Sequence, residues 1–315
     1  MLASIKSLAK RMPIIHRIFA QRDQAYAELA SVRKAYKFAA PGHYYSPHPA
    51  LDEIRGDEAR IFGAMPREFP GMDLREDEQL RLLQQLATFY SDIPFGDQPK
   101  TGLRYYYDNP YYSYSDGIML HCMLRHIKPR RLIEIGSGYS SFVTLDTDQY
   151  FLGGTLAATF IEPYPERLLS RISNADRARM TVIPKRLQDV DLELFKSLSA
   201  GDILFVDSTH VSKIDSDVNR IFFEVLPALA PGVVIHFHDV FYPFEYPKEW
   251  IYEGRAWSEL YMLRTFLQYN NCFKVLLMNT LMTRFHRQFF EQNMPLCLKN
   301  TGGSIWLQKT ELPGN

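Results

Sequence analysis

The segment 131–141 constrains the fold more than any other part of this 315-residue chain. A short apolar run that contains Glu134 ends in Gly136 and Gly138, and a helical pattern follows from about Tyr139. This pattern is typical of a buried parallel strand that turns tightly into a helix. The glycines allow the turn and let a ligand approach the backbone, and the open N–H groups of the helix favour an electron-rich partner. The segment alone indicates either a nucleotide-type cofactor site or a turn made for packing.

From residue 131 onward, short apolar segments alternate with helical ones, which predicts a parallel sheet with helices on both faces. Strands are expected at 131–135, 157–162, 180–184, 202–207, 232–238, 273–278 and 304–308. Helices are expected at 139–151, 165–177, 191–199, 213–229, 253–269 and 283–292. The predicted fold class is therefore α/β, with a Rossmann-like, seven-stranded, mostly parallel sheet and an N-terminal cap of helices and loops.

Three parts are expected along the chain, at 1–40, 41–115 and 116–315. The first is predicted to be a basic amphipathic helix that packs on its own domain, pairs with a partner helix in a homo-oligomer, or lies on an anionic membrane surface. The second is a cap or lid with one helix near 76–90. It also contains six tyrosines within 104–114, which suit a half-buried edge or a pocket wall equally well. The third holds the sheet.

The composition excludes several classes of protein. Lys plus Arg (36) balance Asp plus Glu (36), so no overall charge draws the chain to nucleic acid. The three cysteines are far apart and form no C-x-x-C pair, which argues against a disulfide framework and a cysteine zinc site. No apolar run approaches the ~18 residues of a spanning helix, and no secretory signal pattern is present. We expect a cytoplasmic protein, or one that is peripheral at the inner membrane face.

Ligands of an open α/β sheet bind beyond the carboxyl ends of the strands, near the switch in strand order. The second expected strand is followed by Glu162 and Tyr164, and an acid at this place can accept both hydroxyls of a ribose. The other interpretation of Glu162 is a solvated acid at a helix N-terminus. The third strand leads to Gln188-Asp189, a polar loop able to bind an adenine edge.

The fourth expected strand ends at Asp207, and the fifth ends at His238-Asp239. Because these strand ends adjoin, the three side chains are expected to converge. Two carboxylates suit Mg²⁺, and a neighbouring histidine shifts the choice toward Mn²⁺. His210 lies three residues after Asp207, and its ordinary pKa suits a general base. His236 is expected to be a core histidine.

Together these residues resemble the class I S-adenosylmethionine-dependent methyltransferases over about residues 116–309. The matching positions are Glu134-x-Gly136-x-Gly138, Glu162, Gln188-Asp189, Asp207 and His238-Asp239. The Asp-x-x-His sequence after the fourth strand is similar to metal-dependent O-methyltransferases of small molecules, including sugars of natural products. The turn sequence and the basic N-terminal helix also resemble a bacterial group found among polysaccharide-modifying proteins. Two positions depart from the pattern: Ser140 replaces a third glycine, and His238 replaces a carboxylate.

The resemblance implies an S-adenosylmethionine-dependent O-methyltransferase that acts on a small-molecule or saccharide acceptor, assisted by Mg²⁺ or Mn²⁺. The implied cofactor-binding residues are Glu134, Gly136, Ser137, Gly138, Glu162, Tyr164, Gln188 and Asp207. The implied metal ligands are Asp207, His238 and Asp239, and the implied catalytic residues are His210, Asp207 and Asp239. Binding the acceptor beside the methyl donor would supply much of the rate of this in-line displacement.

Two other functions are consistent with part of the pattern. A nicotinamide-dependent oxidoreductase would also use a glycine turn and an acid for the ribose, but the chain has neither G-x-G-x-x-G nor Tyr-x-x-x-Lys. A non-catalytic scaffold could keep a degenerate cofactor fold, which the acids and histidines at neighbouring strand ends argue against. A hydrolase of the G-x-S-x-G type lacks its nucleophile turn.

Overall fold

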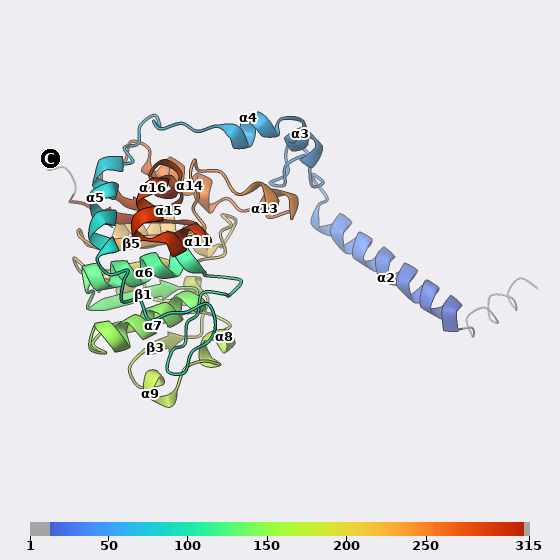
Figure 1. Cartoon of the computed structure of the whole chain (residues 1–315). Helices are drawn as coiled ribbons and strands as arrows, with labels where there is room; N and C mark the ends of the chain where they lie inside the picture. Colours follow the sequence, from blue (N-terminus) through green and yellow to red (C-terminus); the bar gives the residue numbers. More distant parts are fainter. Residues whose placement is uncertain (1–12, 312–315) are drawn as a thin grey trace, which may run out of the picture. The chain divides into compact units, whose positions relative to one another are not determined.

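The structure, a computed structural model, describes residues 13–311. Within them lies a seven-stranded sheet of order β3-β2-β1-β4-β5-β7-β6 (Figure 1). Strands β1 to β5 are parallel, and β7 runs antiparallel to both β5 and β6. The strands are β1 Arg131–Ile135, β2 Ala157–Ile161, β3 Thr181–Ile183, β4 Ile203–Val206, β5 Val234–His238, β6 Phe273–Met278 and β7 Ser304–Lys309. The predicted α/β sheet is confirmed, and each strand is close to its expected bounds.

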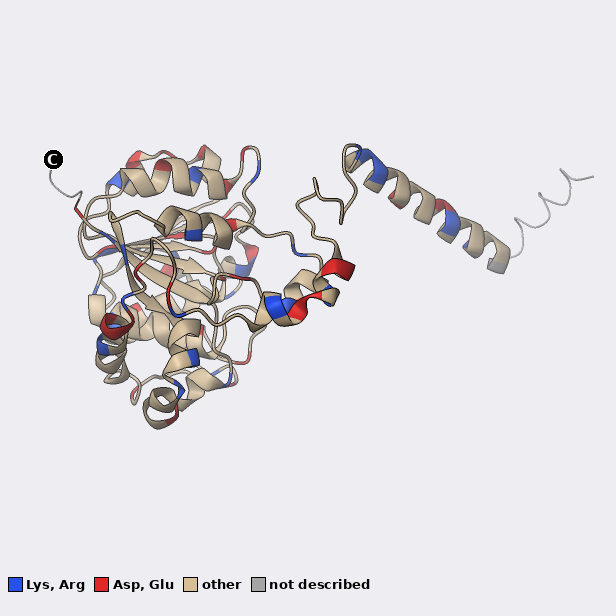
Figure 2. Cartoon of the chain, turned by 90° about the horizontal axis from the view of Figure 1, so that it is seen from above, with Lys and Arg blue, Asp and Glu red and all other residues tan. Residues whose placement is uncertain are grey.

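Helices cover both faces of this sheet, and basic and acidic residues are both scattered over its surface (Figure 2). The longer helices of this part of the chain are α5 Glu76–Ala87, α6 Tyr114–Ile127, α7 Tyr139–Phe151 and α14 Glu259–Leu267. Helix α7 begins and ends where the sequence pattern predicts. The segment 217–228 is helical throughout, as α11 Asp217–Arg220, a π-helical turn at Ile221–Val225 and α12 Leu226–Ala228.

Several predicted helices are shorter or divided. The segment 165–177 forms α8 Glu166–Leu169 and α9 Asn174–Arg177, because Ser173 caps a new helix by accepting from the N–H of Asp176. The segment 253–269 is not one helix, since Gly254 has a left-handed backbone (φ +84°) that ends α13 Lys248–Tyr252. The other pieces are α10 Glu193–Lys196, α15 Asn279–Phe285 and α16 Arg287–Asn293.

The chain forms two compact units. The described residues up to Gly63 and residues 249–256 belong to one, and residues 64–248 and 257–311 belong to the other. The first unit holds α2 Pro13–Ala35, α3 Leu51–Gly56 and α4 Glu58–Gly63. Apolar side chains of α2 such as Ile18 and Val32 are exposed. The beginning of the predicted basic helix lies outside the described residues, and its pairing or membrane contact stays a prediction. None of the described helices has the length and apolar character needed to cross a membrane.

The sheet order places the ends of β1 and β4 next to each other, with β2 on the far side of β1. The side chains of β4 are completely buried, so this strand lies at the centre of the core. Each such side chain contributes about 1.5–3 kcal/mol through its removal from water. The ladder continues past the strands, because the N–H of Gly136 donates to Ile161 O (2.9 Å) and that of Asp207 donates to Ile135 O (2.9 Å). The switch in strand order therefore brings the glycine turn against Asp207.

Candidate active site

Gly136 is the tightest point of the turn after β1. Its backbone is left-handed (φ +84°), and a Cβ atom on it would lie 2.0 Å from the carbonyl oxygen of Asp207. Only glycine fits this place, for both conformational and steric reasons. Gly138 is different, because its φ of 177° is open to any residue and a Cβ there would meet only Arg167, at 3.6 Å.

Glu134 anchors the turn from below. The hydroxyls of Ser140 and Ser141 donate to its Oε1 at 2.6 and 2.9 Å, while its Oε2 has no partner among the described residues. Burial raises the pKa of this completely enclosed carboxyl to about 8. Ser140, one of the two departures from the resembled pattern, thus has a defined bonding role. The buried hydroxyl of Ser137 is also without a partner in the described chain.

Glu162 follows β2 and ties two loops together. Its Oε1 accepts from the N–H of Tyr164 (2.9 Å), and its Oε2 accepts from the N–H of Ser137 (3.3 Å). These two bonds orient the carboxylate beside the glycine turn. The side chain of Gln188 is also engaged, because its amide donates to Asp215 O (2.5 Å), whereas Tyr164 is 78% exposed.

Two cavities meet at these residues, and both are lined by Gly136, Glu162 and Asp207. The first cavity, of about 390 Å³, extends over β2 and β3 and is also lined by Tyr164 and Gln188. The second cavity, of about 250 Å³, extends toward β5. Its other walls include Tyr111, Tyr112, Ser137, Gly138, Tyr139, Arg167, His238 and Asp239. The unpartnered Ser137 hydroxyl and the close glycine backbone fit a cofactor whose polar end lies between the two cavities.

Asp207, His238 and Asp239 converge as the strand order predicts. One donor atom from each lies within 4.8 Å of the others, so the three could hold one metal ion. Burial opposes ionisation of Asp207, but His238 and His210 hold the pKa of its carboxyl below the usual range. Burial likewise disfavours a charged His238, yet the neighbouring carboxylates raise its pKa. The Nδ1 atom of His238 is buried and has no hydrogen-bond partner in the described residues, whereas its Nε2 lies 3.5 Å from Asp239 Oδ1.

His210 lies among three carboxylates. Its Nδ1 faces Glu259 Oε2 at 2.8 Å, and its Nε2 lies 3.4 Å from Asp207 Oδ1 and 3.5 Å from Asp239 Oδ2. Its ring packs on that of Trp257, with 4.4 Å between centroids. Burial opposes its protonation, but the bonds to Asp207 and Glu259 raise the pKa of His210 well above the ordinary value. His210 is not among the described residues that line the two cavities. It is connected to them only through the carboxylates of Asp207 and Asp239.

The backbones of His210 (φ +60°) and Asp239 (φ +55°) are left-handed. Residues other than glycine adopt this conformation at a cost of about 1–3 kcal/mol each. This unfavourable conformation directs the side chains of His210 and Asp239 into the cluster, where they meet at 3.5 Å. Asp239 retains further interactions in addition to the contact with His210.

The wall between α6 and β5 is built by Tyr112. Asn109 fixes its backbone from both sides, donating to Tyr112 O (2.9 Å) and accepting from its N–H (2.8 Å). The ring of Tyr112 packs on His238 at 4.9 Å between centroids, and its buried hydroxyl has no partner in the described chain. Behind it, burial raises the pKa of Asp116 to about 6. The tyrosine-rich segment thus contributes both core packing and a pocket wall.

Sequence reasoning located the strand-end residues but missed their supports. Glu259 and Trp257 come from around the start of α14, far along the chain from His210, and no local pattern marks them. Asn109 is marked only weakly, as a turn residue before a proline. His236 is the expected core histidine, completely buried and stacked on Phe205 at 4.0 Å.

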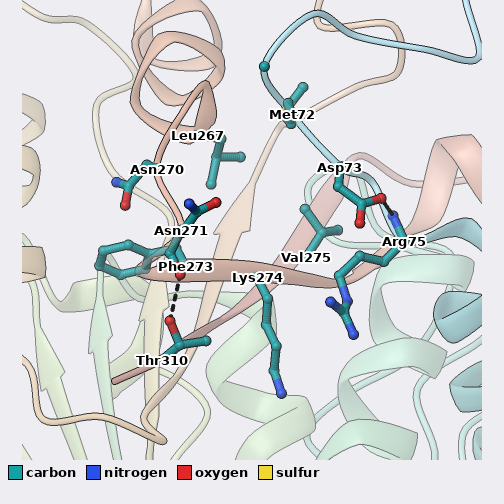
Figure 3. A pocket seen from close by; sticks show the side chains of 11 residues that line it. Met72, Asp73, Arg75, Leu267, Asn270, Asn271, Phe273, Lys274, Val275 and Thr310 are labelled. Atoms are coloured by element: carbon teal, nitrogen blue, oxygen red, sulfur yellow. Dashed lines mark hydrogen bonds between the residues drawn. The ribbon is translucent and has the colours of Figure 1, made fainter. Parts of the chain in front are cut away.

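A separate hollow of about 210 Å³ lies at the opposite edge of the sheet, where β6 begins and β7 ends. Figure 3 shows Lys274 and Arg75 directed along it, with Asn270 and Asn271 above. Because it lies away from the carboxyl ends of the parallel strands, it is not part of the site described above.

Comparisons with known proteins agree with this geometry. Residues 133–240 match the family described as a methyltransferase domain. An uncharacterised protein of Archaeoglobus fulgidus is 33% identical over 178 residues, which are 54% of this chain and 78% of that protein.

Similar folds occur in solved methyltransferase structures. The S-adenosylhomocysteine-bound methyltransferase PaMTH1 of Podospora anserina is 14% identical, over 83% of this chain and 96% of that chain, with a TM-score of 0.42. The O-methyltransferase TomG of Streptomyces achromogenes, in complex with S-adenosylmethionine, is 17% identical over 82% and 99%, also with a TM-score of 0.42. The match to the methyltransferase-domain family argues against the oxidoreductase alternative. Over residues 133–240 the chain carries a methyltransferase domain, on a sheet whose strand order, with antiparallel β7, is that of the class I fold.

Proposed function

We propose that this enzyme transfers a methyl group from S-adenosylmethionine to a hydroxyl of a small molecule or saccharide, with a divalent cation at Asp207, His238 and Asp239. The observation that carries the proposal is the second cavity. It is lined on one side by the glycine turn and on the other by the three-residue cluster. A methyl donor on the turn and an acceptor hydroxyl on the cluster would therefore share one cavity.

The cofactor would occupy both cavities. Bound S-adenosylmethionine supplies an electrophilic methyl group. Gly136, Ser137, Gly138 and Asp207, which line the second cavity, would hold its methionine end. Glu134, whose buried Oε2 has no partner in the described chain, would act on it from beneath the turn. Glu162, oriented by two backbone N–H groups, would accept the ribose hydroxyls, and Tyr164 and Gln188 would contact the adenine in the first cavity.

Two carboxylates and one imidazole suit Mg²⁺ or Mn²⁺. Such an ion would lower the pKa of an acceptor hydroxyl and orient its oxygen. The donor set is consistent with this role, because the three donor atoms are close together and Asp239 is fixed by its left-handed backbone. The packing of Tyr112 on His238 holds the imidazole in place.

His210 is proposed to receive the proton of the acceptor hydroxyl. Glu259 only accepts hydrogen bonds, so it fixes the Nδ1–H of His210 and leaves Nε2 for the exchange. The proton would reach Nε2 by way of Asp207 or Asp239, which lie between His210 and the cavity. Since the pKa of His210 is raised, the proton-free form increases with pH, and activity should rise into the alkaline range.

Calorimetric titration with S-adenosylhomocysteine tests the cofactor. Binding to the folded wild type is expected, and no binding would contradict the proposal. The variant His210→Ala should retain this binding and lose turnover. A His210→Ala enzyme that still turns over, or that keeps the wild-type pH profile, would assign His210 to positioning the carboxylates.

Calorimetric titration with Mn²⁺ tests the cluster in the absence of any acceptor. The variants Asp207→Asn and Asp239→Asn should each weaken Mn²⁺ binding strongly. Asp189→Asn is the matched control, because Asp189 is an acid after β3 that pairs with Arg186 on the surface. Equal Mn²⁺ affinity in all four proteins would refute the metal site. Activity lost after chelation should return with Mg²⁺ or Mn²⁺.

A further inference from the structure

Arg167 places a positive charge on the wall of the second cavity. Its guanidinium lies 4.0 Å from the ring centroid of Tyr111, as in a cation–π pair. None of the ion pairs found among the described residues includes Arg167, although the same cavity is lined by Glu162, Asp207 and Asp239. Glu162 is bound by backbone N–H groups, and the two aspartates lie against histidines. Neutralising these acids therefore does not explain Arg167.

The position of this side chain is defined by two segments. A Cβ atom on Gly138 would lie 3.6 Å from Arg167 Cδ and 3.7 Å from its Nη1, so the head group overlies the glycine turn. On the other side, Asn109 accepts from the N–H of Tyr111 (3.1 Å) and so orients the ring beneath the guanidinium. The charged fork is thus held at the cavity by aromatic packing and retains its N–H donors for a ligand.

We propose that Arg167 binds a carboxylate in the second cavity. A planar guanidinium with several N–H donors matches a carboxylate in a two-point hydrogen bond, and aromatic stacking pre-organises it. Two sources have this chemistry, the methionine carboxylate of the cofactor and an acidic group on the acceptor. The inference rests on the proposed function, since it assumes that cofactor and acceptor meet in this cavity.

Arg171 provides a matched control. Like Arg167, Arg171 is exposed and takes part in none of the ion pairs found among the described residues. Its guanidinium also stacks on tyrosines, at 5.0 Å from the ring centroid of Tyr106 and 5.5 Å from that of Tyr139. It is not among the described residues that line either cavity. Substitution of Arg171 therefore removes a nearby charge, its stacking on Tyr139 and its hydrogen bonds to Arg104 O and Tyr106 Oη, but removes no guanidinium from the cavity wall.

The test compares wild type, Arg167→Gln, Arg167→Lys and Arg171→Gln by calorimetry. S-adenosylhomocysteine carries the carboxylate, and 5′-methylthioadenosine is a related nucleoside thioether without it. If Arg167 binds the cofactor, Arg167→Gln weakens S-adenosylhomocysteine binding by about tenfold to a hundredfold, leaves 5′-methylthioadenosine unchanged, and Arg167→Lys recovers part of the loss. Arg171→Gln should match wild type for both compounds.

If the acceptor is the source, S-adenosylhomocysteine binds Arg167→Gln as tightly as wild type. Glucuronate, titrated into the S-adenosylhomocysteine complex with glucose as the neutral control, then binds wild type and Arg171→Gln and is lost in Arg167→Gln. Equal behaviour of Arg167→Gln and wild type with all probes overturns the inference while leaving the proposed function intact. A wild type that binds no S-adenosylhomocysteine overturns the proposed function itself.

Discussion

After β1 the chain turns through Gly136, whereas after β4 and β5 it turns through His210 and Asp239, and all three residues have a left-handed backbone. On the glycine side the turn costs little, and no side chain is needed at that point. On the other side the same conformation is adopted by residues that lose about 1–3 kcal/mol each in it. The turns at His210 and Asp239 therefore provide side chains to the cluster, whereas the turn at Gly136 provides room for the backbone to approach closely.

The two sides also differ in the range of their contacts. Glu134 is bonded by Ser140 and Ser141, six and seven positions away. His210 depends on Glu259, which is 49 positions away. A short-range arrangement forms with the turn itself, while the long-range cluster forms only when the start of α14 meets the loop after β4. We therefore expect substitutions at the glycine turn to lower stability as well as cofactor binding, and substitutions in the cluster to lower activity with little change in stability.

The largest expected effect is on the second side. Asp207→Asn removes a charge that faces both the proposed cation and His210, while its backbone stays in the ladder with Ile135. Activity should fall by between about a hundredfold and a thousandfold with little change in unfolding. Steady-state kinetics and urea denaturation measure the two quantities. Asp92→Asn serves as the control, because Asp92 pairs with Arg125 and is not among the described residues that line either cavity. An active Asp207→Asn enzyme would remove the distinction between the sides.

The next effect is on stability, at the glycine turn. Gly136→Ala places a Cβ 2.0 Å from Asp207 O at a φ of +84°, so we expect a loss of about 3 kcal/mol in the free energy of unfolding. Gly138→Ala is the control, because its Cβ has room and its φ is ordinary. Urea denaturation of both variants gives the comparison. Similar stability of the two would show that the turn relaxes without cost.

The sequence predicts the parts of this protein that depend on local pattern. The strands are apolar runs bounded by turn residues, so their positions were recoverable to within two residues. The residues at the strand ends followed from the rule that ligands bind at the carboxyl edge of a parallel sheet. Helix lengths were not recoverable where a capping residue such as Ser173 or a left-handed Gly254 divides an otherwise helical pattern.

The site was predictable only for groups that follow a strand directly. Asp207, His238 and Asp239 met because adjacent strands end together. Glu259 was not foreseen, because its contact with His210 is set by the way α14 packs and not by spacing. The place of His210 behind the carboxylates also depends on its left-handed backbone, which its sequence context does not indicate.

A smaller effect should appear in the pH dependence of stability on the glycine side. The pKa of Glu134 in the folded protein, about 8, lies above its ordinary value of 4.5. Between pH 4.5 and pH 8, the folded protein therefore keeps a proton on Glu134 that the unfolded chain has lost. This stabilisation is complete below pH 4.5 and is lost as pH rises through 8. Relative to Glu134→Gln, wild type should lose about 2 kcal/mol from about pH 6 to about pH 8.

Urea denaturation of both proteins across this range measures the difference. Asp116→Asn is the control, since the folded pKa of Asp116 is about 6 and its own contribution changes mainly below that pH. The Asp116→Asn variant should therefore keep the wild-type slope above pH 6. A Glu134→Gln variant with the same slope as wild type would mean that Glu134 stays ionised in the folded enzyme.

The smallest effect tests the strain itself. Asp239→Gly and Asp239→Ala both remove the carboxylate and should both abolish activity, but only alanine must keep a Cβ in the left-handed conformation at φ +55°. Asp239→Gly should be more stable than Asp239→Ala by about 1 kcal/mol, although glycine also loses more entropy on folding. Urea denaturation of the pair measures this difference, with the same exchange at the exposed, right-handed Ala178 as reference, where alanine should be the more stable. If alanine is also the more stable at 239, the backbone there is not strained, and the second side is distinguished from the glycine side by its charges alone.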